Sequence, residues 1–104
     1  MSALEFTEEG WRDAVRRAEL LRAPARQGEA VELVEVARSP RLPTGHAAVY
    51  VSPSARGGLE LHVAVYEKQG GGFAARNACA PLAAADDYQA ARRETEALRA
   101  ALAM

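Results

Sequence analysis

The chain has 104 residues, a formal net charge of −1 and a pI of about 6.1. Near-neutrality disfavours duplex binding, because duplex-binding domains draw much of their affinity from neutralised phosphates. The single cysteine excludes an internal disulfide and favours a reducing compartment. No secretory signal or membrane-length apolar stretch is evident, so the sequence predicts a cytoplasmic protein with one domain over residues 1–104.

The first predicted element is a helix from Thr7 to Arg22. Its first residue is a good N-cap, and Glu8 and Glu9 follow in the turn where carboxylates favour the helix dipole. Phe6 and Trp11 have the spacing of a hydrophobic staple around that cap. An apolar stripe then continues along one side of the helix, which predicts that this side packs on a core.

The middle of the chain predicts consecutive strands joined by short loops. The first strand covers Ala30–Ala37 and is followed by a proline-rich turn at Ser39–Gly45. The second strand covers His46–Ser52 and the third covers Leu59–Lys68, whose strict alternation is typical of a strand with one buried face. A weaker fourth strand, Phe73–Ala78, follows a glycine turn.

The last predicted element is a helix over Asp86–Leu102, capped by its first residue and with Gln89 at the capping-box position. The order is therefore helix, three to four strands, helix. This pattern predicts an α+β two-layer sandwich in which an antiparallel meander is covered on one side by both helices. The buried side of the third strand is expected to be Leu59, Leu61, Val63 and Val65.

The other side of the second and third strands is unusual, because each strand places one histidine and one tyrosine there. A register that pairs Ser52 with Glu60 puts Tyr50 opposite His62 and His46 opposite Tyr66. Ala48 and Ala64 then lie between the two pairs. The predicted binding residues are His46, Tyr50, His62 and Tyr66, joined by Arg76 from the fourth strand.

Three interpretations of this surface remain open. It packs against a second subunit, since aromatic residues are enriched at interface cores. It is an ordinary solvated face of an antiparallel sheet. Or it is a shallow groove on which a flat ligand or single-stranded bases stack, with Arg76 and Lys68 supplying positive charge.

The sequence gives little support to metal or cofactor chemistry. In the expected register His46 and His62 are offset by roughly 13 Å along the strands, too far to share one zinc ion. Cys79 has no activating neighbour in sequence, so a small buried side chain is expected there. The glycine run at 70–72 lacks the Lys-Ser/Thr of a phosphate-binding loop and reads as a hairpin turn. No catalytic, metal or cofactor site is assigned.

The sequence therefore favours a non-enzymatic protein that acts by association, as a homodimer through or near the His/Tyr face. The first alternative is a single-stranded nucleic-acid binder that uses the same face. A weaker alternative is a small-molecule enzyme with His46 or His62 as general base, a role that suits histidine near neutral pH.

Overall fold

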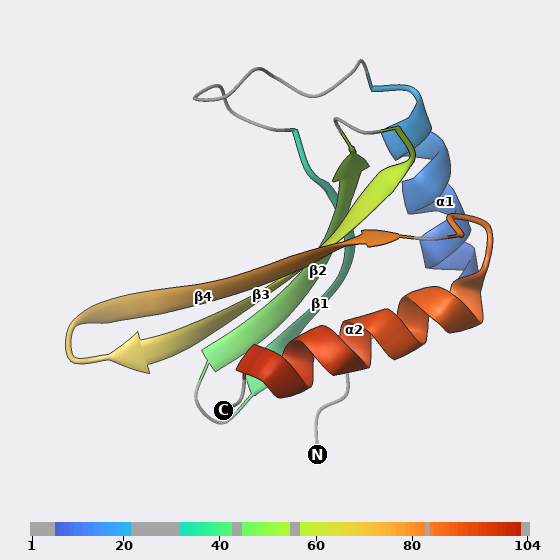
Figure 1. Ribbon diagram of the computed structural model, residues 1–104. Helices are drawn as coiled ribbons and strands as arrows, with labels where there is room; N and C mark the ends of the chain where they lie inside the picture. The colour runs from blue at the N-terminus through green and yellow to red at the C-terminus, as the bar shows by residue number, and fades with distance from the viewer. Residues whose placement is uncertain (1–5, 22–31, 43–44, 55–56, 83, 103–104) are drawn as a thin grey trace.

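The computed structural model describes residues 6–21, 32–42, 45–54, 57–82 and 84–102. The described elements are two helices and four strands, and the strands form one antiparallel sheet in the order β1-β2-β3-β4 (Figure 1). Both helices pack on the same face of this sheet, so the predicted α+β two-layer arrangement is confirmed. The bounds are α1 (Glu8–Glu19), β1 (Val34–Leu42), β2 (Gly45–Pro53), β3 (Leu59–Gln69), β4 (Gly72–Leu82) and α2 (Tyr88–Leu102).

Helix α1 begins as predicted. The Thr7 side chain accepts a hydrogen bond from the Gly10 backbone at 3.1 Å, and Glu8 and Glu9 occupy the first turn. The helix is shorter than predicted, because it ends at Glu19 rather than Arg22. Residue 20 already leaves the helix, and its backbone N–H bonds to carbonyls of the last turn.

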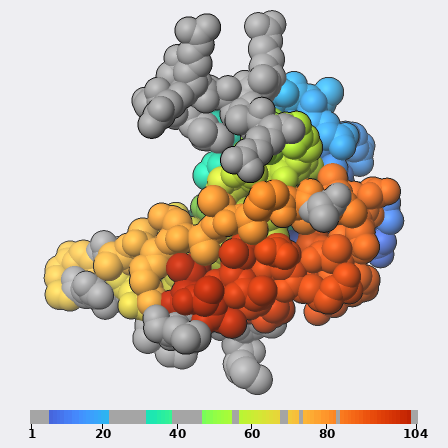
Figure 2. All heavy atoms as spheres, in the orientation of Figure 1, coloured from blue at the N-terminus to red at the C-terminus, as the bar shows by residue number. Residues whose placement is uncertain are grey.

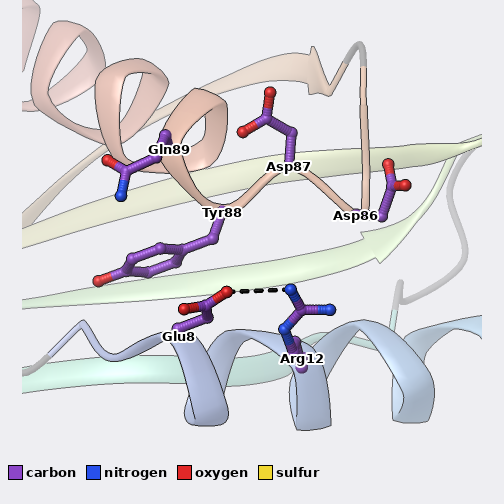
Figure 3. Close-up of a pocket in the computed structure, with 6 residues that line it drawn as sticks. All are labelled: Glu8, Arg12, Asp86, Asp87, Tyr88 and Gln89. Atoms are coloured by element: carbon purple, nitrogen blue, oxygen red, sulfur yellow. Dashed lines mark hydrogen bonds and ion pairs between the residues drawn. The ribbon is translucent and has the colours of Figure 1, made fainter.

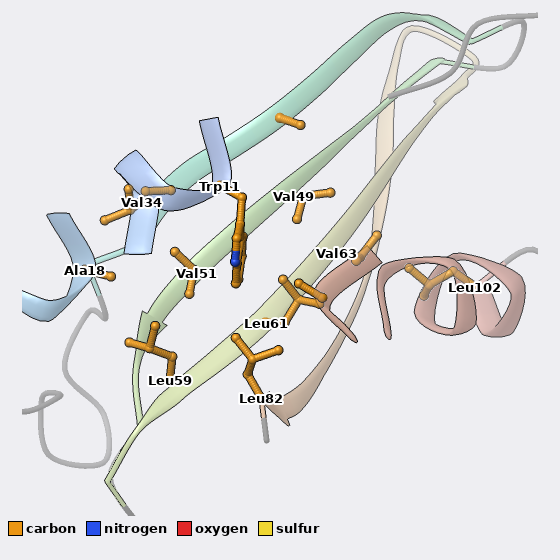
Figure 4. Packing of buried hydrophobic residues seen from close by; sticks show 13 residues of the cluster. Trp11, Ala18, Val34, Val49, Val51, Leu59, Leu61, Val63, Leu82 and Leu102 are labelled. Atoms are coloured by element: carbon orange, nitrogen blue, oxygen red, sulfur yellow. The ribbon is translucent and has the colours of Figure 1, made fainter. Parts of the chain in front are cut away.

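Trp11 is the largest side chain in the core between helices and sheet (Figure 4). It is fully buried, and its indole N–H donates to the Ala85 carbonyl at 3.1 Å. The expected alternation of β3 is confirmed here, since Leu61 and Val63 are fully buried on the helix-facing side. The cluster contains Trp11, Ala14, Ala18, Val34, Ala37, Val49, Val51, Leu59, Leu61, Val63, Leu82, Ala91 and Leu102.

Strand β1 differs most from the sequence prediction. The expected turn at Ser39–Gly45 is wrong, because Ser39, Pro40 and Arg41 continue the strand and β2 already begins at Gly45. Residues 30 and 31, where the strand was expected to start, lie outside the described residues. Proline lacks a backbone N–H and is tolerated here because β1 is an edge strand whose register with β2 shifts after Ser39.

Strand β4 is longer than the predicted Phe73–Ala78. It pairs with β3 without interruption over eleven residues, from Gly72 to Leu82. Alanine occupies both faces of this segment, so the sequence shows little alternation and underestimates the strand. Pro81 was expected to close the strand, but it lies inside it near one end, which an edge strand permits.

Helix α2 starts two residues later than predicted, and its cap is Asp87 rather than Asp86. The Asp87 carboxylate accepts a hydrogen bond from the Ala90 backbone at 3.0 Å. Tyr88 follows and joins the two helices, because its ring stacks on Phe6 and its hydroxyl donates to the Phe6 carbonyl at 2.6 Å. Among the described residues, no helix is long and apolar enough to cross a membrane.

Candidate functional site on the outer face of the sheet

The sheet face turned away from both helices, here called the outer face, carries the residues predicted as a site. The predicted register of β2 and β3 is confirmed: Ser52 pairs with Glu60 and Tyr50 with His62. The backbone of residue 46 lies opposite residue 66, but the side chain of His46 is outside the described part. The described outer-face residues are Glu35, Arg38, Ala48, Tyr50, Ser52, Glu60, His62, Ala64, Tyr66, Ala75, Asn77, Cys79 and Pro81.

Tyr50 and Tyr66 form a bridge across the middle of this face. Their positions are offset by four residues on neighbouring strands, roughly 13 Å, which is within the combined reach of two tyrosine side chains. The two side chains share a hydrogen bond, so they lean toward each other over Ala48 and Ala64. Those alanines are 0% and 4% exposed although they lie on the face that the helices do not cover. Burial, together with the bond to Tyr50, raises the pKa of Tyr66.

Two residues of β1 extend this tyrosine bridge. Glu35 pairs with Tyr50 and Arg38 with Ala48, so both lie on the outer face. The Arg38 guanidinium contacts the Glu35 carboxylate at 2.8 Å and also hydrogen-bonds Tyr50. The Glu35 charge, followed by the bond to Tyr50, raises the pKa of Arg38. Glu35, Arg38, Tyr50 and Tyr66 therefore form a continuous polar row across three strands.

A second group on the outer face surrounds His62. Its Nε2 lies 2.9 Å from the Ser52 hydroxyl and 4.0 Å from a Glu60 carboxylate oxygen. Burial lowers the pKa of His62 from its ordinary value of 6.5, and the nearby Glu60 charge opposes that shift. The imidazole is therefore kept neutral at physiological pH.

This Ser-His-Glu group does not have the geometry of a hydrolase. In a catalytic triad the acid bonds one ring nitrogen and the nucleophile bonds the other. Here Nε2 is the His62 atom found near both Ser52 and Glu60. Ser52 is also only 1% exposed, so a substrate has no access to its hydroxyl. The arrangement orients His62 and satisfies a buried hydroxyl, but it offers no nucleophile.

Cys79 lies on the outer face, directly opposite His62. The expectation that it is buried is wrong, because the free thiol is exposed. Sequence reasoning missed this Cys–His neighbourhood, which only the full length and register of β4 reveal. The pair falls short of a metal site: within the described part of the chain, no three His, Cys, Asp or Glu side chains come together to hold an ion.

Arg76 is not brought into this group. It pairs with Val65 and shares the helix-facing side of the sheet, where its guanidinium forms an ion pair with Glu67. The backbone of Lys68 lies opposite residue 73 at the end of the hairpin, and its side chain is outside the described part. The positive charge expected beside the tyrosines comes instead from Arg38, which the sequence analysis did not single out.

A separate hollow of about 410 Å³ lies where the N-termini of α1 and α2 meet (Figure 3). Its charged groups are explained by the helices themselves: Glu8 pairs with Arg12 at 2.9 Å, and Asp87 caps α2. Carboxylates are favoured at helix N-termini because they complement the dipole. The hollow is lined by Glu8, Arg12, Asp86, Asp87, Tyr88 and Gln89.

Comparison with known proteins adds no family to this description. No family model, curated protein or solved structure matches the chain.

Proposed function

We propose that this protein acts by association in the cytoplasm, as a homodimer whose subunits meet through the outer face. One observation carries the proposal: Tyr50, Tyr66 and Arg38 lie together on the face that neither described helix covers, and Arg38 is paired there with Glu35 at 2.8 Å. Tyrosine and arginine are among the residues that contribute most to interfaces. Side chains already fixed in place lose little entropy when a partner binds.

The size of the face supports a contact between two copies. Four strands of nine to eleven residues make a surface of roughly 600–700 Å² at about 4.8 Å per strand and 3.3 Å per residue. Two copies then bury roughly 1,200–1,400 Å², the lower end of stable interfaces. The mixed polarity of the face suits a dimer that forms from folded monomers, since such interfaces are only about as apolar as other surfaces.

Charge favours a protein partner over nucleic acid. Single-strand binders combine stacking rings with cations free to contact the backbone. Arg38 is already bonded to Glu35, and Glu60 adds a further carboxylate to the outer face. Arg76, which the nucleic-acid alternative requires, belongs to the other face.

Sedimentation of the full chain tests the proposal. At tens of micromolar the wild type is expected to sediment as a multiple of its 11.1 kDa monomer, and Tyr66→Glu is expected to halve that mass. The control Leu20→Glu adds the same charge at a side chain that is 81% exposed on the helical side and is expected to change nothing. Circular dichroism confirms that each variant is folded.

Two outcomes contradict the proposal. A wild-type monomer at that concentration excludes association, and an unchanged mass for folded Tyr66→Glu excludes this face as the contact. Fluorescence anisotropy with a labelled single strand decides the nucleic-acid alternative. We expect no salt-sensitive binding, and binding that weakens with added salt and is lost in Tyr66→Glu establishes that alternative instead.

A further inference from the structure

The two edge strands of the sheet differ in how they are protected. Exposed edges carry unpaired backbone groups that attract other strands, and proteins usually block them with bulges, charges or prolines. Strand β1 has two register irregularities, one after Glu35 and one after Ser39, and it contains Pro40. Its charged pair Glu35–Arg38 lies beside the first irregularity. Edge β1 is therefore blocked in several ways.

Edge β4 lacks most of these devices. It pairs with β3 in regular register from Gly72 to Leu82, and its one proline is at position 81, near the end. Its one charged side chain, Arg76, is bonded to Glu67 of the neighbouring strand β3. Figure 2 shows β4 as a gold-to-orange band at the surface beside the red helix α2. Among the described elements, only β3 pairs with it.

We propose that β4 is a second self-association surface, which pairs antiparallel with β4 of another copy. A two-fold axis at Asn77, the middle residue of the strand, places Asn77 opposite its own counterpart. Ala75 then lies opposite Cys79 of the second copy, and Arg76 lies opposite Ala78. The two sheets continue into one sheet of eight strands with all four helices on the same side.

The composition of β4 is what makes a second copy the occupant. In this register the one charged residue of the central segment 74–80, Arg76, faces Ala78, and every other pair joins small or neutral residues, so no like charges are opposed. The same strand supplies both halves of the contact, as an isologous interface requires. A strand from an unrelated protein would not in general place small side chains opposite those of β4.

This contact does not rest on the outer-face dimer, and the two are geometrically compatible. Edge pairing uses a two-fold axis normal to the sheet, whereas face packing uses one parallel to the sheet. Perpendicular axes of this kind generate a closed tetramer with 222 symmetry when they intersect, which is the arrangement proposed here. Its layers run helices, sheet, sheet, helices, with the tyrosine bridges of all four subunits enclosed between the sheets.

Sedimentation of a variant series separates the two contacts. The wild type is expected at four times the monomer mass, and Tyr66→Glu at twice it, because the edge pair survives loss of the face. In that background Asn77→Lys opposes two like charges on the axis and is expected to give monomers. The matched control, Tyr66→Glu with Leu20→Lys, carries its lysine at an exposed position directly after α1, which packs on β1 and β2, and is expected to stay a dimer.

Contrary outcomes point to one contact or the other. A monomeric Tyr66→Glu, or a Tyr66→Glu/Asn77→Lys protein that remains a dimer, overturns the edge pairing. A wild-type dimer that is unchanged by Tyr66→Glu but dissociated by Asn77→Lys overturns the outer-face proposal and leaves the edge contact standing. A wild-type monomer overturns both.

Cross-linking tests the register itself. In the Tyr66→Glu background, Ala75→Cys brings a new thiol opposite the natural Cys79 of the second copy, within the range for a disulfide. Mild oxidation is expected to give a covalent dimer, and Cys79→Ser is expected to abolish it. Within one chain residues 75 and 79 are roughly 13 Å apart along the strand, so an internal bond does not compete. Failure to cross-link overturns this register.

Discussion

The two faces of the sheet bury their small residues in different ways. On the helix-facing side Val49, Leu61 and Val63 are covered by Trp11 and the helices, and the contacts are apolar. On the outer face Ala48 is just as buried, but its neighbours there are the polar side chains of the tyrosine bridge, which belong to the sheet itself. The stability of an apolar contact depends on how completely the side chains fill the available volume. The stability of a polar contact depends instead on a few hydrogen bonds with defined directions. Mutations should therefore affect the two faces by different amounts.

The largest effect is expected on the helix-facing side. Trp11→Ala leaves a cavity at the centre of the core, and such truncations cost about 3–5 kcal/mol of unfolding free energy. Urea denaturation followed by circular dichroism measures the loss. Trp11→Phe is the matched control: it keeps an aromatic ring but loses the bond to the Ala85 carbonyl, so it should cost clearly less. Equal losses for both variants would mean that this bond, rather than volume, dominates.

On the outer face, Ala64→Leu should have the next largest effect. This alanine is only 4% exposed and lies between the positions of Tyr50 and Tyr66, so a larger side chain has to displace its neighbours. Overpacking of this kind costs about 1–3 kcal/mol, and thermal or urea unfolding reports it. Ala101→Leu, at an exposed position on α2, provides the control and should be close to neutral. An Ala64→Leu variant with unchanged unfolding free energy would show that Tyr50 and Tyr66 do not pack tightly against Ala48 and Ala64.

The contrast between the faces also explains what the sequence could predict. Strict alternation in residues 59–68 was enough to assign both faces of β3. It restricts the register with β2 to matching parity, and the register considered, with Ser52 opposite Glu60, is the one observed. Alternation was not enough for β1, where Glu35 and Arg38 are three residues apart and yet share the outer face. An extra residue at position 36 makes this possible, because a bulge reverses the parity that follows it.

The tyrosine bridge and the neighbourhood of Cys79 were also beyond sequence reasoning. Alternation assigns a side chain to a face, but the direction in which it leans depends on strand twist and on its partners. Cys79 required the register of β4, and alanines on both faces of that strand remove the periodicity from which a register is inferred.

A smaller effect should follow from removing one hydroxyl of the bridge. Tyr66→Phe keeps the aromatic ring and loses the hydrogen bond to Tyr50. This loss should lower the free energy of unfolding by about 0.5–1.5 kcal/mol. Combining Tyr66→Phe with Tyr50→Phe in a double-mutant cycle measures the coupling directly. Additive losses would contradict the bond, since two changes that remove the same interaction should cost less together than their sum.

The smallest effect is expected from His62, and it appears only at acidic pH. Because burial lowers the pKa of His62 in the folded protein, the unfolded chain binds a proton more readily as the pH falls below about 6.5. The stability that His62 contributes is therefore fully present above that pH and is lost as the pH falls through its lower folded value. His62→Gln should flatten the pH dependence of the urea midpoint in this window, while His46 is present in both proteins and cancels from the comparison. If wild-type stability instead rises on acidification and His62→Gln removes the rise, attraction to Glu60 outweighs burial, and charge rather than burial dominates this part of the outer face.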